Sequence, residues 1–206
     1  MRCPRCHFDS PEGFRFCGQC GQALHQAAGK PSLGSAGAYG ERRHITVLFS
    51  DLSSYTTLCE QLDPEDVSEI MTRVFTSIEQ RVSRFEGVVD KFMGDGAMIL
   101  FGVDTVHEDD ALRAVKCAMA LHQDIDGLHG TPADRINFPL HMHSGINTGL
   151  VVKGHRQGET VSDVAGDTIN VASRLCSLAG PGEILVSGET RDQTRQHVDF
   201  QSRGPS

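Results

Sequence analysis

The chain has 206 residues, of which 38% are hydrophobic and 22% charged, and its formal net charge is −8. This composition is typical of a soluble globular protein with one substantial domain and a small appendage. No apolar run approaches the roughly eighteen residues of a membrane helix, and no hydrophobic signal region opens the chain, so we expect a cytoplasmic protein without a membrane partner. The acidic charge disfavours a large nucleic-acid interface. Divalent cations would still allow such a protein to bind a polyphosphate.

Four of the seven cysteines form two pairs near the N-terminus, in the sequences CPRC and CGQC. A CxxC turn lets two thiolates reach one ion, and two such turns predict a closed tetrahedral site for one structural Zn²⁺. Residues 1–22 resemble a zinc ribbon whose stability would come from its metal. Redox-active thiols are the alternative, and a protein partner suits the ribbon better than nucleic acid because its basic surface is thin. The predicted ligands are Cys3, Cys6, Cys17 and Cys20.

Residues 23–41 are rich in Ala, Gly and Ser, which predicts a flexible linker. Residues 44–49, HITVLF, then predict a buried strand that ends at Asp51. Asp63 and Pro64 are typical of a helix start, and the next apolar residues recur at helical spacing. The members of this stripe are Val67, Ile70, Met71, Val74, Ile78 and Val82.

The next elements continue in a regular order. Two β-rich runs around Gly94, Asp95 and Gly96 predict a hairpin over 87–101. A helix is expected over 108–125, a strand over 138–146 with 149–153 as its returning partner, and a helix from an N-cap at Asp167 to Gly180. A short strand, 183–187, and a helix, 188–196, follow. The inward residues of the 108–125 helix are expected to be Leu112, Val115, Met119 and Ile125.

The order β-α-β-β-α-β with additions predicts an α+β fold of the ferredoxin-like kind. In this fold, helices pack on one face of a largely antiparallel sheet.

Two aspartates are expected at one end of this sheet, because Asp51 ends the first strand and Asp95 occupies the hairpin tip. Paired aspartates without a nearby histidine or cysteine suit Mg²⁺ or Mn²⁺, which usually arrive with a phosphate substrate. The backbone N–H groups of Leu52, Ser53 and Ser54 could cradle that phosphate. Taken singly, each aspartate is more typical of a turn than of a metal site. The placement of the pair favours metal.

Three motifs in order, LFSDL, DKFMGDGAMILFG and VSDVAGDTINVASRL, resemble the catalytic domain of class III nucleotidyl cyclases over residues 42–206. Together with HEDDALRAV and the ribbon, they are similar to bacterial multidomain cyclases related to soluble adenylyl cyclases. The resemblance implies cyclisation of a nucleoside triphosphate to a 3′,5′-cyclic monophosphate with release of pyrophosphate. It also implies two Mg²⁺ or Mn²⁺ ions on Asp51 and Asp95, and two shared sites in a twofold homodimer.

The same resemblance assigns base recognition to Lys91 and Asp163, a donor and an acceptor that match adenine and therefore ATP. It assigns ribose orientation to Asn170 and transition-state charge stabilisation to Arg174, which lie four residues apart on one helix face. A guanylate cyclase and a catalytically silent dimerisation module are the alternatives. The family domain continues with a hairpin that carries a phosphate-contacting lysine, so we expect this chain to be truncated at its C-terminus.

The remaining histidines and cysteines predict structural roles. His141 and His143 alternate on a strand and share one sheet face, where partly buried structural histidines are more typical than a metal pair. Cys59, Cys117 and Cys176 are each expected to be small core residues.

Overall fold

The computed structural model describes residues 41–53, 55–128, 138–154 and 163–203. The strands are β1 (Glu41–Leu52), β2 (Val88–Met93), β3 (Gly96–Phe101), β4 (Met142–Gly154), β5 (Asp163–Ala165) and β6 (Ile184–Val186). The helices are α1 (Tyr55–Gln61), α2 (Pro64–Arg84), α3 (Asp110–Asp126), α4 (Asp167–Leu178) and α5 (Gly188–Thr194). None of the helices in these ranges is long and apolar enough to cross a membrane. The predicted zinc ribbon and linker lie outside the described residues.

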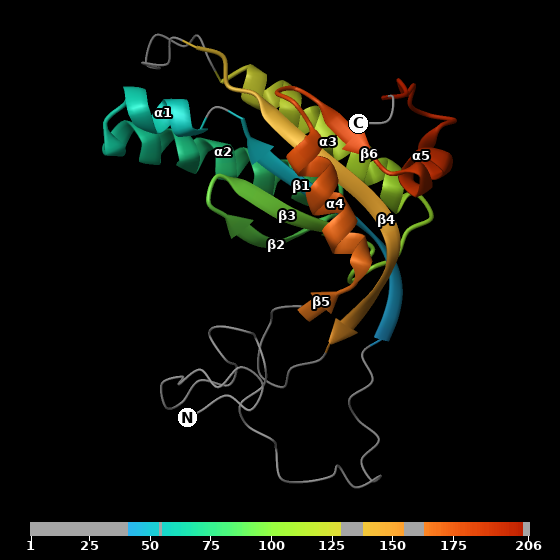
Figure 1. Cartoon of the computed structure of the whole chain (residues 1–206). Helices are drawn as coiled ribbons and strands as arrows, with labels where there is room; N and C mark the ends of the chain where they lie inside the picture. Colours follow the sequence, from blue (N-terminus) through green and yellow to red (C-terminus); the bar gives the residue numbers. More distant parts are fainter. Residues whose placement is uncertain (1–40, 54, 129–137, 155–162, 204–206) are drawn as a thin grey trace, which may run out of the picture. The chain divides into compact units, whose positions relative to one another are not determined.

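The strands form one sheet in the order β2-β3-β1-β4-β5, and β6 adds to β4 in parallel while the other pairs are antiparallel (Figure 1). β1 therefore lies in the middle, between β3 and β4. The expected turn between a strand over 138–146 and its partner over 149–153 is wrong. β4 runs straight through Gly149, because its register with β1 is continuous from Met142 to Lys153.

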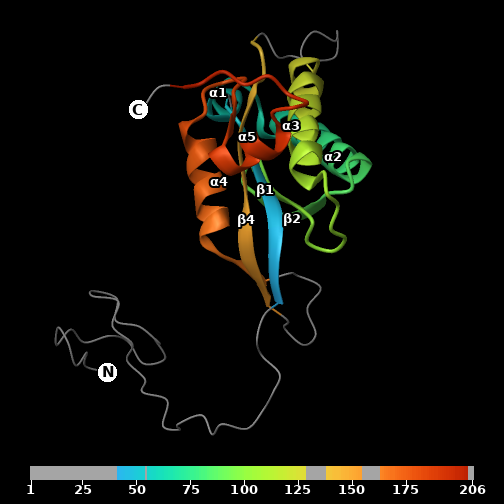
Figure 2. The same ribbon diagram turned by 90° about the vertical axis from the view of Figure 1, so that its right-hand side faces the viewer.

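The expected α+β fold with an antiparallel-rich sheet is confirmed, but helices cover both of its faces. Successive residues of β1 point to opposite faces of the sheet, so Leu48 belongs to one buried cluster and Val47 to the other. α2 and α3 cover one face and α4 the other, with the strands seen between them in Figure 2. Residues 45–50 and 96–101 are buried without interruption, which is typical of strands covered on both sides.

The helix predicted after Asp63 is α2, and all six residues of its predicted apolar stripe are buried. In α3, by contrast, Met119 is 43% exposed and not inward as expected. The buried side of α3 instead follows Val115, Ala118, Leu121 and Ile125, a spacing of three and four residues that leaves Met119 on the outer side.

Two smaller expectations also differ from the structure. Gly166, not Asp167, is the N-cap of α4, so Asp167 is the first helical residue and its charge lies near the positive end of the helix dipole. Cys59 is exposed because the seven-residue α1 buries only Leu58. Cys117 and Cys176 are core residues as expected, and burial raises the pKa of each thiol to about 12.

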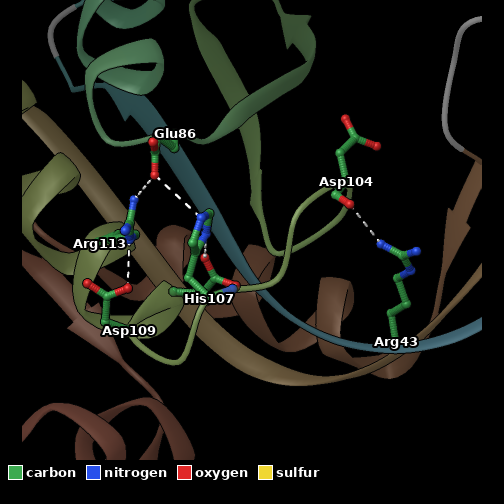
Figure 3. A network of polar contacts seen from close by, with 7 residues as sticks. Arg43, Glu86, Asp104, His107, Asp109 and Arg113 are labelled. Atoms are coloured by element: carbon green, nitrogen blue, oxygen red, sulfur yellow. Dashed lines mark hydrogen bonds and ion pairs between the residues drawn. The ribbon is translucent and has the colours of Figure 1, made fainter.

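A polar network holds the loop between β3 and α3, at the end of β3 farthest from Asp95 (Figure 3). Glu86 accepts a hydrogen bond from Arg113 and lies 3.5 Å from Nε2 of His107. Arg113 also donates to Asp109, and the pKa of that carboxyl is lowered mainly by this bond. Asp110 completes the network by accepting a hydrogen bond from the backbone N–H of His107 at 2.9 Å. Glu86 and Asp109 therefore share the charge of Arg113, and Asp110 is held by the backbone N–H of His107.

Candidate active site

The sheet brings Asp51 and Asp95 together at one of its ends. Ser50 pairs with Ala97 across β1 and β3, which sets Asp51 beside Gly96 at the tip of the β2–β3 hairpin. A Cβ atom at Gly96 would lie 2.6 Å from Oδ1 of Asp51, so only glycine leaves room for this carboxylate against β3. The hairpin turns at Gly94, whose φ of +63° favours glycine, and Asp95 follows it directly.

The electrostatics of this pair are unfavourable without a cation. The pKa of Asp95 is raised from its ordinary value, first by burial and then by the neighbouring charge of Asp51. Two close carboxylates with oxygen ligands alone fit Mg²⁺ or Mn²⁺, which commonly take one or two protein carboxylates and complete their shell with water and phosphate. The described ranges contain no cluster of three or more His, Cys, Asp or Glu residues placed to hold a metal ion.

The predicted phosphate cradle does not have free amides at its first two positions. The backbone N–H of Leu52 donates to Oδ1 of Asp51 at 3.1 Å, and that of Ser53 donates to the carbonyl of His141 at 2.9 Å. β1 continues through Leu52, whose side chain is buried in the core, so the chain has not yet turned into a helix start here. Ser54 lies outside the described residues.

Asn170 and Arg174 lie on α4 and are both exposed. The buried side of this helix is formed by Thr168, Ala172 and Cys176, of which the last two pack on the sheet. Arg174 has no ion pair with any residue that the structure describes. Its guanidinium is therefore available to an anionic ligand.

Lys91 and Asp163 lie on β2 and β5, the first and last strands in the sheet order. A register shift between Val89 and Lys91 marks an irregularity at Asp90. Nζ of Lys91 lies 3.1 Å from Oδ2 of Asp90, and its side chain is 54% exposed. Asp163 pairs through its backbone with Gly154. Its side chain is outside what the structure describes.

Two further residues at this end of the sheet are not apparent in the sequence. His143 is the β4 partner of Asp51, with Nε2 3.9 Å from Oδ2 of the carboxylate. Tyr55 starts α1, and the pKa of its phenol is raised mainly by Cys59 and to a smaller extent by Asp95. The prediction that His141 and His143 share one face of a strand is wrong, because His141 precedes β4 and its ring bonds to Asp126 of α3. The register between β1 and β4 identifies His143 as the residue that meets Asp51.

Comparison with known proteins identifies the family of this domain. The model of the adenylate and guanylate cyclase catalytic domain matches residues 38–206. The chain belongs to this family. Its relatives include adenylate cyclase 1 of Rhizobium meliloti, which is 26% identical over 79% of the chain, and the protein R02095 of the same organism, which is 30% identical over 85%. The chain spans only 25% and 17% of these two relatives, respectively.

Solved structures of cyclases share the fold of this domain. The adenylyl cyclase CyaB from P. aeruginosa superposes with a TM-score of 0.71 at 31% identity, covering 76% of this chain and 83% of that protein. The guanylyl cyclase Cya2 superposes with a TM-score of 0.66 at 35% identity, covering 81% and 89%. The cyclase fold is thus shared with proteins that act on different bases, so overall similarity does not decide the substrate.

Proposed function

We propose that this cyclase domain is an adenylate cyclase, which converts ATP to 3′,5′-cyclic AMP and pyrophosphate at the interface of a cytoplasmic homodimer. The observation that carries the proposal is the convergence of Asp51 and Asp95 at one sheet end in a member of the cyclase family. Two neighbouring carboxylates repel each other unless a cation joins them or they share a proton, and such pairs are concentrated at functional sites.

In this proposal Asp51 and Asp95 hold two Mg²⁺ or Mn²⁺ ions together with the nucleotide phosphates. When bound, the ions supply the Lewis acidity that makes the ribose 3′-hydroxyl more acidic, and they offset the charge of the triphosphate. The exposed Arg174 adds a fixed fork of donors for the charge that develops on the reacting phosphate. Asn170, one helical turn before it, orients the ribose.

Base choice rests on Lys91 and Asp163. An ammonium group donates to adenine N1, and a carboxylate accepts from the adenine 6-amino group. Guanine has a donor at N1 and an acceptor at position 6. The ammonium of Lys91 would therefore meet a second donor, and the carboxylate of Asp163 a second acceptor. The exposed ammonium of Lys91 supports this role, since its only described partner is the adjacent Asp90. Guanylate cyclase activity is the second candidate, favoured by the similarity to Cya2.

A product assay separates these possibilities. Purified protein is incubated with ATP or GTP and Mn²⁺, and cyclic AMP and cyclic GMP are quantified by chromatography. We expect cyclic AMP as the main product, and we expect Lys91→Glu to lower the ratio of cyclic AMP to cyclic GMP. A main product of cyclic GMP would establish the second candidate. The absence of both products at high protein concentration would indicate a silent dimerisation module.

The shared site of the proposed homodimer predicts complementation between inactive variants. Asp51→Ala and Arg174→Ala proteins are each expected to be inactive alone, because each lacks part of every site. Mixed dimers contain one site in which both residues are intact, so mixing should restore up to about half of the activity per mixed dimer. Failure of proven mixed dimers to regain activity would exclude a site built from two chains.

We also propose that residues 1–22 form a zinc ribbon that docks a protein partner, that 23–41 link it, and that 42–206 are the catalytic domain. Four thiolates at CxxC spacing suit one structural Zn²⁺. Elemental analysis of the purified protein should find one zinc per chain, and Cys17→Ser with Cys20→Ser should remove it. Retention of zinc by that double variant would rule out the four-thiolate site.

A further inference from the structure

His143 is the residue that directly faces Asp51 in the sheet. The two are register partners on the antiparallel strands β4 and β1, so their side chains project from the same face. On its other side Asp51 is bordered by Gly96, which has no side chain. The carboxylate therefore packs over Gly96 of β3 and has the imidazole ring of β4 beside it.

The ring of His143 is held in a defined orientation. Nδ1 lies 2.9 Å from Oγ of Ser53, and the backbone N–H of Ser53 is itself fixed by the carbonyl of His141 at 2.9 Å. When the Ser53 hydroxyl donates to Nδ1, the ring proton resides on Nε2, which is the nitrogen that faces Asp51. The side chain is only 18% exposed, so the ring has little freedom to turn away.

The distance from Nε2 to Oδ2 of Asp51 is 3.9 Å, which is longer than a hydrogen bond. At this distance the ring sterically limits rotation of the carboxylate toward β4. The dipole of the ring also has a fixed orientation relative to the carboxylate. The opposite oxygen, Oδ1, accepts a hydrogen bond from the backbone N–H of Leu52 at 3.1 Å. The carboxylate is thus confined from both sides while 42% of the Asp51 side chain is exposed to a ligand.

We propose that His143 is a positioning residue, which, with Ser53, keeps the Asp51 carboxylate directed toward Asp95 and the ion that the two would share. This inference rests on the proposed function of Asp51 as a metal ligand. Partners of metal ligands are commonly worth 10- to 100-fold in metal affinity.

The test compares four proteins: the wild type, His143→Ala, His143→Gln and His141→Ala. His141 is the control, since it is the nearest histidine in the sequence but precedes β4, and its ring bonds to Asp126 of α3 at 2.8 Å. Mn²⁺ binding is measured directly from the electron paramagnetic resonance signal of free Mn²⁺, in the presence of a non-cyclisable ATP analogue. The Mn²⁺ concentration for half-maximal activity and the KM for ATP are measured in parallel. Circular dichroism confirms folding.

We expect His143→Ala to raise the Mn²⁺ dissociation constant by about tenfold, with the KM for ATP at saturating Mn²⁺ nearly unchanged. His143→Gln retains a donor and should recover most of the affinity, and His141→Ala should match the wild type. Unchanged Mn²⁺ affinity in His143→Ala would overturn the proposal. So would a raised KM for ATP without a change in Mn²⁺ affinity, because the ring would then contact the nucleotide.

These outcomes are distinguishable from failure of the proposed function. A wild type that makes no cyclic nucleotide contradicts the cyclase proposal, but the resonance measurement needs no turnover and still reports whether His143 supports the Asp51 site.

Discussion

The two ends of β3 arrange their charges in opposite ways. At one end, Asp51 and Asp95 place two negative charges side by side, and the pKa of Asp95 is raised by burial and by Asp51. At the other end, Glu86 lies between Arg113 and His107, while Asp109 accepts a hydrogen bond from Arg113 and Asp110 one from the backbone N–H of His107 (Figure 3). We call the first region unbalanced, because its two carboxylates have no arginine or lysine partner among the described residues, and the second balanced, because Arg113 and His107 lie beside its carboxylates.

This difference indicates which region is built for a ligand. A balanced network stabilises a loop modestly and needs nothing from outside the chain. An unbalanced pair destabilises the folded domain unless a cation joins it, and such groups concentrate at functional sites. The contrast makes separate predictions for activity and for stability at the two ends.

The largest effect is expected from Asp51→Asn or Asp95→Asn. Loss of either ligand should lower cyclase activity by more than about 100-fold, since even indirect partners of a metal cost up to that much. Thermal unfolding in EDTA should nevertheless show Asp95→Asn to be as stable as the wild type or more stable. The reason is that a raised carboxyl pKa means that the charged form is disfavoured in the folded state at neutral pH. A clear loss of stability in EDTA would contradict the unbalanced pair.

Gly96→Ala should break the same region without removing a charge. The added Cβ would lie 2.6 Å from Oδ1 of Asp51 and 2.9 Å from the carbonyl of Ser50, so the carboxylate must move. We expect activity to fall by about tenfold or more, as for other disturbed partners of metal ligands. Gly188→Ala is the control, because nothing lies within 4 Å of its added Cβ. Equal activity of both variants would show that the position of Asp51 against β3 does not matter.

His122 links the buried core to the charged end of the sheet. Nε2 of His122 lies 2.9 Å from Oγ of Ser144, which lies 2.7 Å from Oγ of Ser50, the residue before Asp51. Burial lowers the pKa of His122 below its ordinary value of 6.5, although Asp126 opposes this and His141 and His143 add to it.

The unfolded chain therefore binds a proton at His122 more readily than the folded domain does. The free energy of unfolding should have its full value above about pH 6.5, and it should decrease as the pH falls below that value. Urea unfolding at pH 7.5 and 5.5 measures this decrease, and His122→Gln should reduce it. An unchanged pH dependence in that variant would assign acid sensitivity to other groups.

The smallest effect is expected in the balanced region. Glu86→Gln removes a carboxylate whose side chain is 59% exposed, so unfolding should become easier by less than about 1 kcal/mol. Cyclase activity should stay within about twofold of the wild type, because the network lies at the far end of β3. Chemical denaturation and a product assay check both values, and a large loss of activity would remove the distinction between the two ends.

Much of this fold follows from periodicity alone. The stripe from Val67 to Val82 predicts α2 correctly because six apolar residues at helical spacing can bury only as a helix. The glycine-flanked Asp95 likewise predicts the β2–β3 hairpin. These features depend on neighbours in the chain, which is where sequence patterns carry information.

The remaining features depend on contacts between distant residues. The position of α4 on the second face and the unbroken course of β4 are set by pairing with β1, which no local pattern encodes. The meeting of His143 with Asp51 has the same origin, as a one-residue shift in register would move His143 to the other face. The backbone N–H groups of Leu52 and Ser53 were expected to bind phosphate, but they donate to Asp51 and to the carbonyl of His141. The reason is that β1 extends beyond its apolar run, as far as Leu52.

The most direct test of this account compares cyclic nucleotide formation by the wild type, Asp51→Asn and Glu86→Gln, with ATP and Mn²⁺ and with folding confirmed for each protein. The account predicts cyclic AMP from the wild type and from Glu86→Gln at similar rates, and almost none from Asp51→Asn. Retained activity in folded Asp51→Asn, or no product from the wild type at any protein concentration, would contradict it.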